Sequence, residues 1–194
     1  MTGDDDAPPA AAVLRDFVNT LEPQVDEESL GSSGDLQAWL VGRGLLAASA
    51  SLTATDLVAA VTIREGLRAV LLGHAGHAPD HEAIRALNRV LATFPVRLDF
   101  DEACYRLRGA NESPFGEAAA ALADAIRQCS EDGTWRRLKV CARDTCRWAF
   151  YDASRNQVRR WCSMAGCGNH IKMRRAYRVR KARSVGGQHA GHVR

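Results

Sequence analysis

Four cysteines in the last third of the chain have the type and spacing of a metal site. Four residues separate Cys141 from Cys146, four separate Cys162 from Cys167, and fifteen lie between the two pairs. Each pair can come from one tight turn, and the intervening loop can bring the turns together around a tetrahedral zinc ion. Four thiolates would fill the coordination shell and leave no position for a catalytic water. The spacing therefore predicts one structural Zn²⁺ ion per chain.

Two alternatives to this zinc site stay open in the sequence. An iron–sulfur cluster also uses cysteine thiolates, but two compact pairs inside a small basic segment favour zinc. The four cysteines could also be unrelated buried residues. The other two cysteines, Cys104 and Cys129, lie beside apolar positions, and we expect both in the hydrophobic core.

Basic residues concentrate around the four cysteines. Residues 135–194 hold 16 Lys and Arg against 2 Asp and Glu, a net charge of +14, whereas residues 1–134 hold 10 against 21, a net charge of −11. This asymmetry indicates two units with different partners, of which the basic unit is expected to meet a polyanion. The alternative is that the charges only solvate an exposed face.

The segment after the second cysteine pair is the strongest candidate for phosphate binding. It has no Gly or Pro between Asn169 and Arg183, which predicts a basic helix. We expect phosphate contacts from basic residues on both sides of that cysteine pair: Arg155, Arg159, Arg160, Lys172, Arg174, Arg175, Arg178 and Lys181.

Aromatic residues crowd the same segment. They are Trp135, Trp148, Phe150, Tyr151 and Trp161. Such residues can stack on nucleic-acid bases. A small metal module also needs aromatic side chains to build its own core, and this second interpretation is the one we favour.

Ahead of the metal segment, apolar residues at helical spacing predict a mainly helical domain. Helix ends are marked by Ser, Thr and Asp before the apolar runs and by Gly or Pro after them. The predicted elements are a helix over residues 10–21, a loop over 22–34, a short helix capped by Asp35, a longer helix over about 54–73 capped by Thr53 or Thr55, a helix opened by Asp80, and a helix that begins at Ser113-Pro114.

One stretch changes to the two-residue period of a strand. Apolar residues at Val96, Leu98 and Phe100 alternate with charged ones, and the pattern returns from Tyr105, so a β-hairpin is expected near residues 96–109. The fold class is therefore α+β: a mainly helical N-terminal domain with one β-hairpin, followed by a small, treble-clef-like zinc module with four cysteine ligands that ends in a basic helix.

Two further groups of polar residues could bind ligands. Asn19 stands at the end of an otherwise apolar helix, where it could face a ligand pocket or satisfy the end of its own helix. His74, His77 and His81 have a spacing that could suggest a metal, but Gly73, Gly76 and Pro79 break the helix there, so no shared face is expected.

Within the cysteine segment, the stretches WAFYD-S-N, RRWCSM and Cys167-Gly168-Asn169 resemble the CGNR zinc finger. The segment ahead of it is similar to the ABATE domain, through FVNTL (17–21), DLQAWL, IREGLRAVL and LNRVLA. The resemblance implies a bacterial stress-induced transcription regulator. It covers an ABATE-like domain over 10–134 and a CGNR-type finger over 135–183. From their composition, the acidic residues 1–9 are expected to be a disordered tail and residues 184–194 a flexible tail.

The resemblance adds Asn169 and His170 to the expected nucleic-acid contacts, with one departure from the family motif. The fourth letter of that motif is Arg, and this chain has His170. A permanently charged guanidinium is thus replaced by a ring that is mostly neutral at pH 7.

These observations predict a zinc-containing, DNA-binding transcriptional regulator, not an enzyme, whose N-terminal domain senses a ligand or contacts protein. An RNA-binding protein, an enzyme or small-molecule-binding domain with a structural finger, and a protein-interaction scaffold are the alternatives. The composition, 46% apolar and 25% charged, excludes a disordered polymer. An acidic N-terminus without an apolar run indicates a cytoplasmic protein, no membrane contact is expected, and a homodimer is possible.

Overall fold

A computed structural model describes residues 6–111, 113–169 and 173 of the chain. Several predictions lie outside these residues. They are the basic helix with His170, Lys172, Arg174, Arg175, Arg178 and Lys181, the tail over 184–194, and the first five residues of the N-terminal tail. Within the described part, α1 begins at Pro9, and Ala7 already packs against the hydrophobic core.

The helical domain follows the predicted pattern of apolar faces and caps. Thr53, Asp80 and Ser113 accept hydrogen bonds from the first turns of their helices, as predicted. One cap differs from the prediction, because Ser32 caps α2 and Asp35 lies three residues inside it. The helices described in full are α1 (Pro9–Val18), α2 (Ser33–Gly42), α3 (Ala54–His74), α4 (His81–Leu91) and α5 (Pro114–Glu131).

The strands in the described ranges form three separate antiparallel pairs. The predicted hairpin at 96–109 is present as β3 and β4. A second, very short hairpin, formed by β1 and β2, interrupts the predicted loop 22–34. Its first residue, Leu21, directly precedes that loop. The bounds are β1 (Leu21–Glu22) with β2 (Glu27–Glu28), β3 (Val96–Phe100) with β4 (Tyr105–Gly109), and β5 (Leu138–Val140) with β6 (Ala149–Tyr151).

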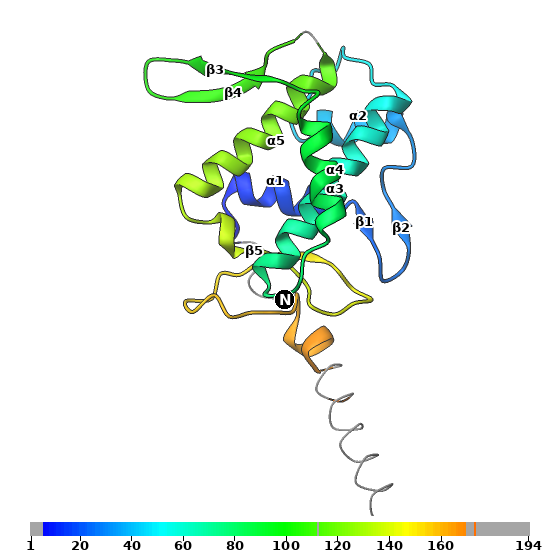
Figure 1. The fold of residues 1–194 in the computed structure, drawn as a ribbon, viewed down its shortest axis with the longest axis vertical. Coiled ribbons are helices and arrows are strands. Elements are labelled where there is room, and N and C mark those ends of the chain that lie inside the picture. The colour runs from blue at the N-terminus through cyan, green and yellow to red at the C-terminus, as the bar shows by residue number, and fades with distance from the viewer. Residues whose placement is uncertain (1–5, 112, 170–172, 174–194) are drawn as a thin grey trace, which may run out of the picture.

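Helices α3 and α5 pack against α1, helices α2 and α4 pack against α3, and the cysteine-bearing segment lies at one end of this bundle (Figure 1). Helices α3 and α4 approach closely at Gly66, where an added Cβ would lie 2.4 Å from the Cβ of Leu87. A short 3-10 helix over Trp135–Arg137 leads from α5 into β5. No described helix has the length and apolar character needed to cross a bilayer.

The hydrophobic core does not stop at the end of α5. Leu138 and Val140 of β5 and Ala149 and Tyr151 of β6 are buried in the same cluster as Phe17 and the inner faces of α3 and α5. The β5–β6 hairpin thus joins the helical core, while the loops that carry the cysteines extend beyond it. Residues 138–151 therefore position the metal site relative to the helices.

The two cysteines outside the metal motif have different environments. Cys129 on α5 is fully buried, as predicted. Cys104 is exposed, which corrects the prediction of a core position. The reason is local: Cys104 lies in the turn of the β3–β4 hairpin, where its backbone N–H donates to the Asp101 carboxylate at 2.8 Å.

Candidate metal centre and its junction with the helical core

The four predicted metal ligands converge at one point. The Sγ atoms of Cys141, Cys146, Cys162 and Cys167 all lie within 4.8 Å of one another. Cys162 lies 3.7 Å from Cys146 and 3.8 Å from Cys167, measured between Sγ atoms. Four sulfurs placed about 2.3 Å from a central zinc ion would be separated by about 3.8 Å. The donor set and its dimensions therefore fit a tetrahedral zinc ion.

Charge at this centre also favours a cation. Hydrogen bonds from Cys146 and Cys162 lower the pKa of Cys141, and the same contacts raise the pKa values of Cys146 and Cys162, so the four sulfurs do not all ionise without a cation. The Nη1 atom of Arg143 lies 3.9 Å from Cys167 Sγ and donates to Gln24 Oε1 at 3.2 Å. Closely spaced thiolates repel one another unless a metal ion binds between them. A bound zinc ion would supply that charge and crosslink the two cysteine-bearing loops.

A buried ion pair organises the loop between the cysteine pairs. Lys139 Nζ donates to Asp152 Oδ2 at 2.7 Å, and both side chains are buried. Asp152 also accepts from the backbone N–H of Ser154 and Arg159, and Lys139 also donates to the Gln157 carbonyl. Burial alone would raise the pKa of Asp152, but the hydrogen bonds from Lys139 and Ser154 lower it below its ordinary value. This pair fixes residues 152–159 against β5.

The three predicted phosphate contacts ahead of Cys162 have different surroundings. Arg159 donates to the carbonyls of Trp161 and Cys162, and its guanidinium lies 4.9 Å above the centre of the Phe150 ring. The Arg159 guanidinium is therefore occupied by contacts within the metal module. Arg155 and Arg160 are exposed, and Arg160 Nη2 contacts His77 Nε2 at 3.1 Å. Asn169 is also exposed at the end of the described segment.

The aromatic residues of this segment mainly build the module. Phe150 is fully buried on β6, and Trp148 and Trp161 pack against the cysteine cluster. Trp135 meets the ring of His74 edge to face, with 5.1 Å between ring centres. These contacts support the interpretation of a structural core rather than a base-stacking surface.

Asn19 connects the helical domain to the metal module. Its Nδ2 donates to the carbonyl of Ala149 at 2.9 Å, and its Oδ1 accepts from the N–H of Ala149 at 2.7 Å. The side chain therefore continues the edge of β6 rather than only satisfying the end of α1. Asn19 also lines a cavity. It therefore has the pocket position that was one of its two predicted roles, and it also bonds to Ala149.

Two buried arginines on α3 were not among the predicted site residues: Arg68, which completes the junction, and Arg64, which joins α3 to β2. Arg68 donates to the carbonyls of Val18 at 2.6 Å and Arg147 at 2.8 Å, so it spans from α1 to the loop beside Cys146. Arg64 is only 2% exposed and donates hydrogen bonds to both carboxylate oxygens of Glu28, at 2.7 and 2.8 Å. The sequence feature that could have identified them is their position within an apolar helical face. Charged side chains are rarely buried there unless they are paired.

Two of the three histidines at and after the end of α3 contact the metal module: His74, the last residue of α3, and His77. His74 Nδ1 lies 2.9 Å from the carbonyl of Leu138, which assigns the N–H to that nitrogen. Burial lowers the pKa of His74, so the ring is neutral at pH 7. Among the described residues, the cysteine cluster is the group that could hold a metal ion.

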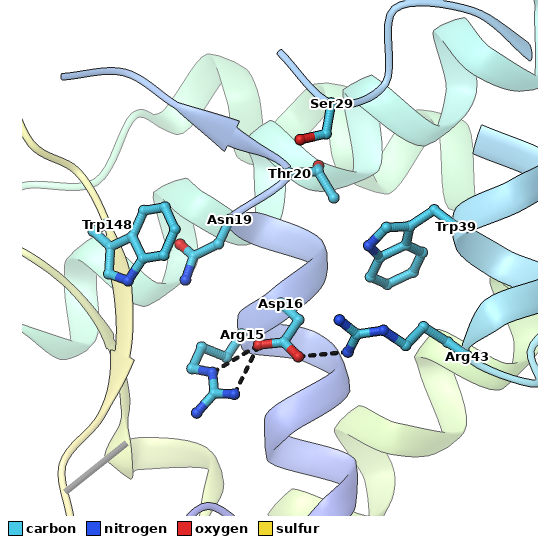
Figure 2. Close-up of a pocket in the computed structure, with 8 residues that line it drawn as sticks. All are labelled: Arg15, Asp16, Asn19, Thr20, Ser29, Trp39, Arg43 and Trp148. Atoms are coloured by element: carbon cyan, nitrogen blue, oxygen red, sulfur yellow. Dashed lines mark hydrogen bonds and ion pairs between the residues drawn. The ribbon is translucent and has the colours of Figure 1, made fainter. Parts of the chain in front are cut away.

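A cavity of about 370 Å³ lies where α1, α2 and the metal module meet. Figure 2 shows Trp148 and Trp39 on opposite sides of α1, with Asp16 between Arg15 and Arg43. Asp16 accepts from Arg15 at 2.8 Å and from Arg43 at 2.5 Å, so this carboxylate joins α1 to the end of α2. The cavity is lined by Arg15, Asp16, Asn19, Thr20, Ser29, Trp39, Arg43 and Trp148.

Replacing Asn19 with alanine should weaken the attachment of the metal module. Ala149 is fully buried, so its N–H and carbonyl would both lose their partner. We expect a loss of about 1–3 kcal/mol in the free energy of unfolding, measured by denaturant titration. Asn88→Ala on the exposed face of α4 is the matched control. Equal stability of the two variants would show that the Asn19 contacts do not hold the module.

Comparison with known families finds two profiles that match this chain. Residues 137–181 match the profile of the CGNR zinc finger. Residues 11–146 match the profile of ABATE, described as "Putative stress-induced transcription regulator". No curated protein matches the chain. The two profiles overlap over residues 137–146, the stretch that contains β5 and the first cysteine pair.

Proposed function

This chain belongs to the ABATE family and carries a CGNR zinc finger, and on that basis we propose that it is a zinc-containing, DNA-binding transcriptional regulator. One zinc ion per chain would hold the finger together through Cys141, Cys146, Cys162 and Cys167. The closed set of four thiolates supports a structural ion, and we propose a binding role without catalysis. The proposed setting is the cytoplasm, where thiols stay reduced and free to bind metal.

The observation that carries this proposal is the charge of the metal-bearing segment. Residues 135–194 have a net charge of +14 with only two acidic residues, and one of these, Asp152, is already paired with Lys139. Arg136, Arg155 and Arg160 are exposed on the described part of the module. Such a surface favours a nucleic-acid backbone, whose condensed counterions are released when phosphates are neutralised.

The affinity for duplex DNA should depend steeply on salt. If about five phosphates are neutralised, the logarithm of the association constant should fall against the logarithm of salt concentration with a slope of about −4 to −5. Fluorescence anisotropy with a random-sequence duplex measures this slope. Arg174→Glu/Arg178→Glu should weaken binding to every duplex and flatten the slope, whereas Arg85→Glu/Arg89→Glu on α4 should change neither.

Two outcomes of the same measurement would overturn the proposal. Binding that is absent at low salt would favour a protein-interaction scaffold. Binding to structured RNA that duplex DNA cannot displace would favour the RNA-binding alternative, because the same basic surface would serve both.

A second role, ligand sensing, is favoured by the cavity beside the metal module. The Arg43 guanidinium is 38% exposed at the cavity, where it can contact an anion, and the indoles of Trp39 and Trp148 offer flat apolar surfaces. We therefore propose a small aromatic acid as ligand. Trp148 stands two residues after Cys146, so a ligand that contacts it would act on the metal module as well as on α1 and α2.

Benzoate and benzamide test this role, because they have similar shape and differ in charge. At ten times its dissociation constant a ligand stabilises the folded protein by about 1.4 kcal/mol. We expect benzoate to raise the melting temperature in a saturable way and benzamide to have no effect. Arg43→Leu should abolish the benzoate effect, whereas Arg89→Leu should preserve it. Equal responses to the two compounds would contradict an anion site.

A further inference from the structure

The β3–β4 hairpin leaves one strand edge unpaired within the described chain. Strand β4 is fixed to α5, because Leu107 N–H donates to Asp124 at 3.0 Å and the Arg127 guanidinium lies 4.5 Å from the centre of the Tyr105 ring. Strand β3 lies on the outer side, and the hairpin projects from the helices (Figure 1). Every residue of β3 is exposed, including Phe100 at 73%.

The backbone of β3 directs a full set of hydrogen-bonding groups outward. At the ends of the hairpin, Ala110 N–H donates to the Pro95 carbonyl and Asp101 N–H donates to the Cys104 carbonyl. Odd-numbered residues of β3 therefore pair with β4. In an antiparallel ladder the alternate residues point their N–H and C=O groups the other way. The groups that face away from β4 thus belong to Val96, Leu98 and Phe100.

The sequence of β3 is complementary to itself when it is reversed about Leu98. In an antiparallel pair of β3 strands, Leu98 faces the partner's Leu98, and Val96 faces the partner's Phe100. Arg97 then faces the partner's Asp99, so opposite charges meet on one side of the sheet and apolar side chains on the other. We propose that β3 binds β3 of a second copy of this chain, so that the two hairpins form one four-stranded antiparallel sheet.

The outward-facing groups match this register. Val96, Leu98 and Phe100 would form the hydrogen-bonded pairs, using the N–H and C=O groups that β4 does not use. Arg97 and the partner's Asp99 would then form a non-hydrogen-bonded pair, in which directly opposite Cα atoms lie closest, about 4.5 Å apart. A shift of the register by two residues would set Arg97 against the partner's Arg97, or Asp99 against the partner's Asp99. Charge therefore selects one register.

Charges within the hairpin also favour the second copy. Arg97 stands directly opposite Arg108 in the β3–β4 register, and Arg108 Nε lies 3.6 Å from Asp99 Oδ2. Like charges placed directly opposite destabilise a strand pair. The partner's Asp99 would lie on the free side of Arg97 and compensate the repulsion from Arg108.

The apolar side of β3 gains cover in the same arrangement. Val96, Leu98 and Phe100 are 43%, 54% and 73% exposed, and each would acquire an apolar neighbour across the new strand pair. A single strand pair is smaller than a standard protein interface, so we expect a dissociation constant on the order of micromolar. The dimer is closed by a two-fold axis and leaves no further β3 edge.

Charge exchange tests this dimer in the full-length, zinc-loaded protein. In sedimentation velocity without nucleic acid, the wild type should form dimers as concentration rises. Arg97→Asp and Asp99→Arg should each raise the dissociation constant at least about tenfold, because like charges then face each other. An equimolar mixture of the two single variants should form heterodimers, and the double variant Arg97→Asp/Asp99→Arg should dimerise again.

The exposed Arg85→Asp variant on α4 is the control and should dimerise as the wild type does. A wild type that stays monomeric at 100 times the expected constant, about 0.1 mM, would overturn the proposal. Dimers that neither single variant weakens would overturn it as well, since they would use another surface. No nucleic acid is present in this experiment, so its failure is distinct from failure of the proposed DNA binding.

Discussion

Replacing one cysteine of each pair, as in Cys146→Ser/Cys162→Ser, is expected to abolish zinc binding and unfold the cysteine-bearing loops. The two loops are joined at their tips by the four sulfurs, which lie within 4.8 Å of one another. Structural zinc contributes about 10–16 kcal/mol of apparent binding free energy in isolated fingers. Elemental analysis should therefore find about one zinc per wild-type chain and almost none in the variant.

Unfolding after zinc loss should be confined to part of the chain. Strands β5 and β6 are buried against the helices, so they have a second source of stability besides the metal. Hydrogen exchange should become fast over residues 141–148 and 158–168 and stay slow in α1, α3 and α5. Cys104→Ser removes an exposed thiol outside the cluster and should keep both the zinc and the exchange pattern. Less than half an equivalent of metal in untreated wild type would contradict the prediction.

Local signals account for what the sequence predicts correctly. Helix caps such as Thr53 and Ser113 depend on residues three positions away, and the alternation at Val96, Leu98 and Phe100 belongs to one hairpin. The cysteine spacing is also local, since each pair needs only one turn. For these features the interaction that stabilises the structure lies within a few residues of the signal.

Long-range contacts account for what the sequence leaves open. The bonds of Asn19 to Ala149 join residues 130 positions apart, and Arg68 reaches Arg147 over 79 positions. No periodicity encodes such pairs. The cavity between Trp39 and Trp148 has the same origin, because its walls come from α1, α2 and the metal module. Its lining could be identified only after the β5–β6 hairpin was placed against α1.

Arg159 shows that basic residues which are neighbours in the sequence can have different environments in the folded protein. The sequence groups it with Arg155 and Arg160 as one basic cluster. In the structure Arg159 turns inward to backbone carbonyls and the Phe150 ring, whereas Arg155 stays exposed. A guanidinium with five donors satisfies loop carbonyls as readily as phosphate oxygens. Net charge therefore overestimates the number of arginines available to a polyanion.

Outside the cysteines, breaking the buried ion pair of Lys139 and Asp152 should cause the largest loss of unfolding free energy from a single substitution. Replacing Lys139 with methionine keeps much of the side-chain volume but leaves the Asp152 carboxylate buried without a counter-charge. Breaking such a pair by removing one partner costs about 3–5 kcal/mol. Denaturant titration of the zinc-loaded protein should show this loss, because β5 and the loop 152–159 are fixed through the same carboxylate.

A second substitution separates the buried charge from the lost contact. Asp152→Asn in the Lys139→Met background removes the charge, while its amide oxygen can still accept from Ser154 or Arg159. The double variant should therefore recover at least about 1 kcal/mol of the stability lost by Lys139→Met. Arg136→Met, an exposed neighbour, should change stability by no more than about 0.5 kcal/mol. If Lys139→Met costs no more than Arg136→Met, the ion pair does not hold this loop.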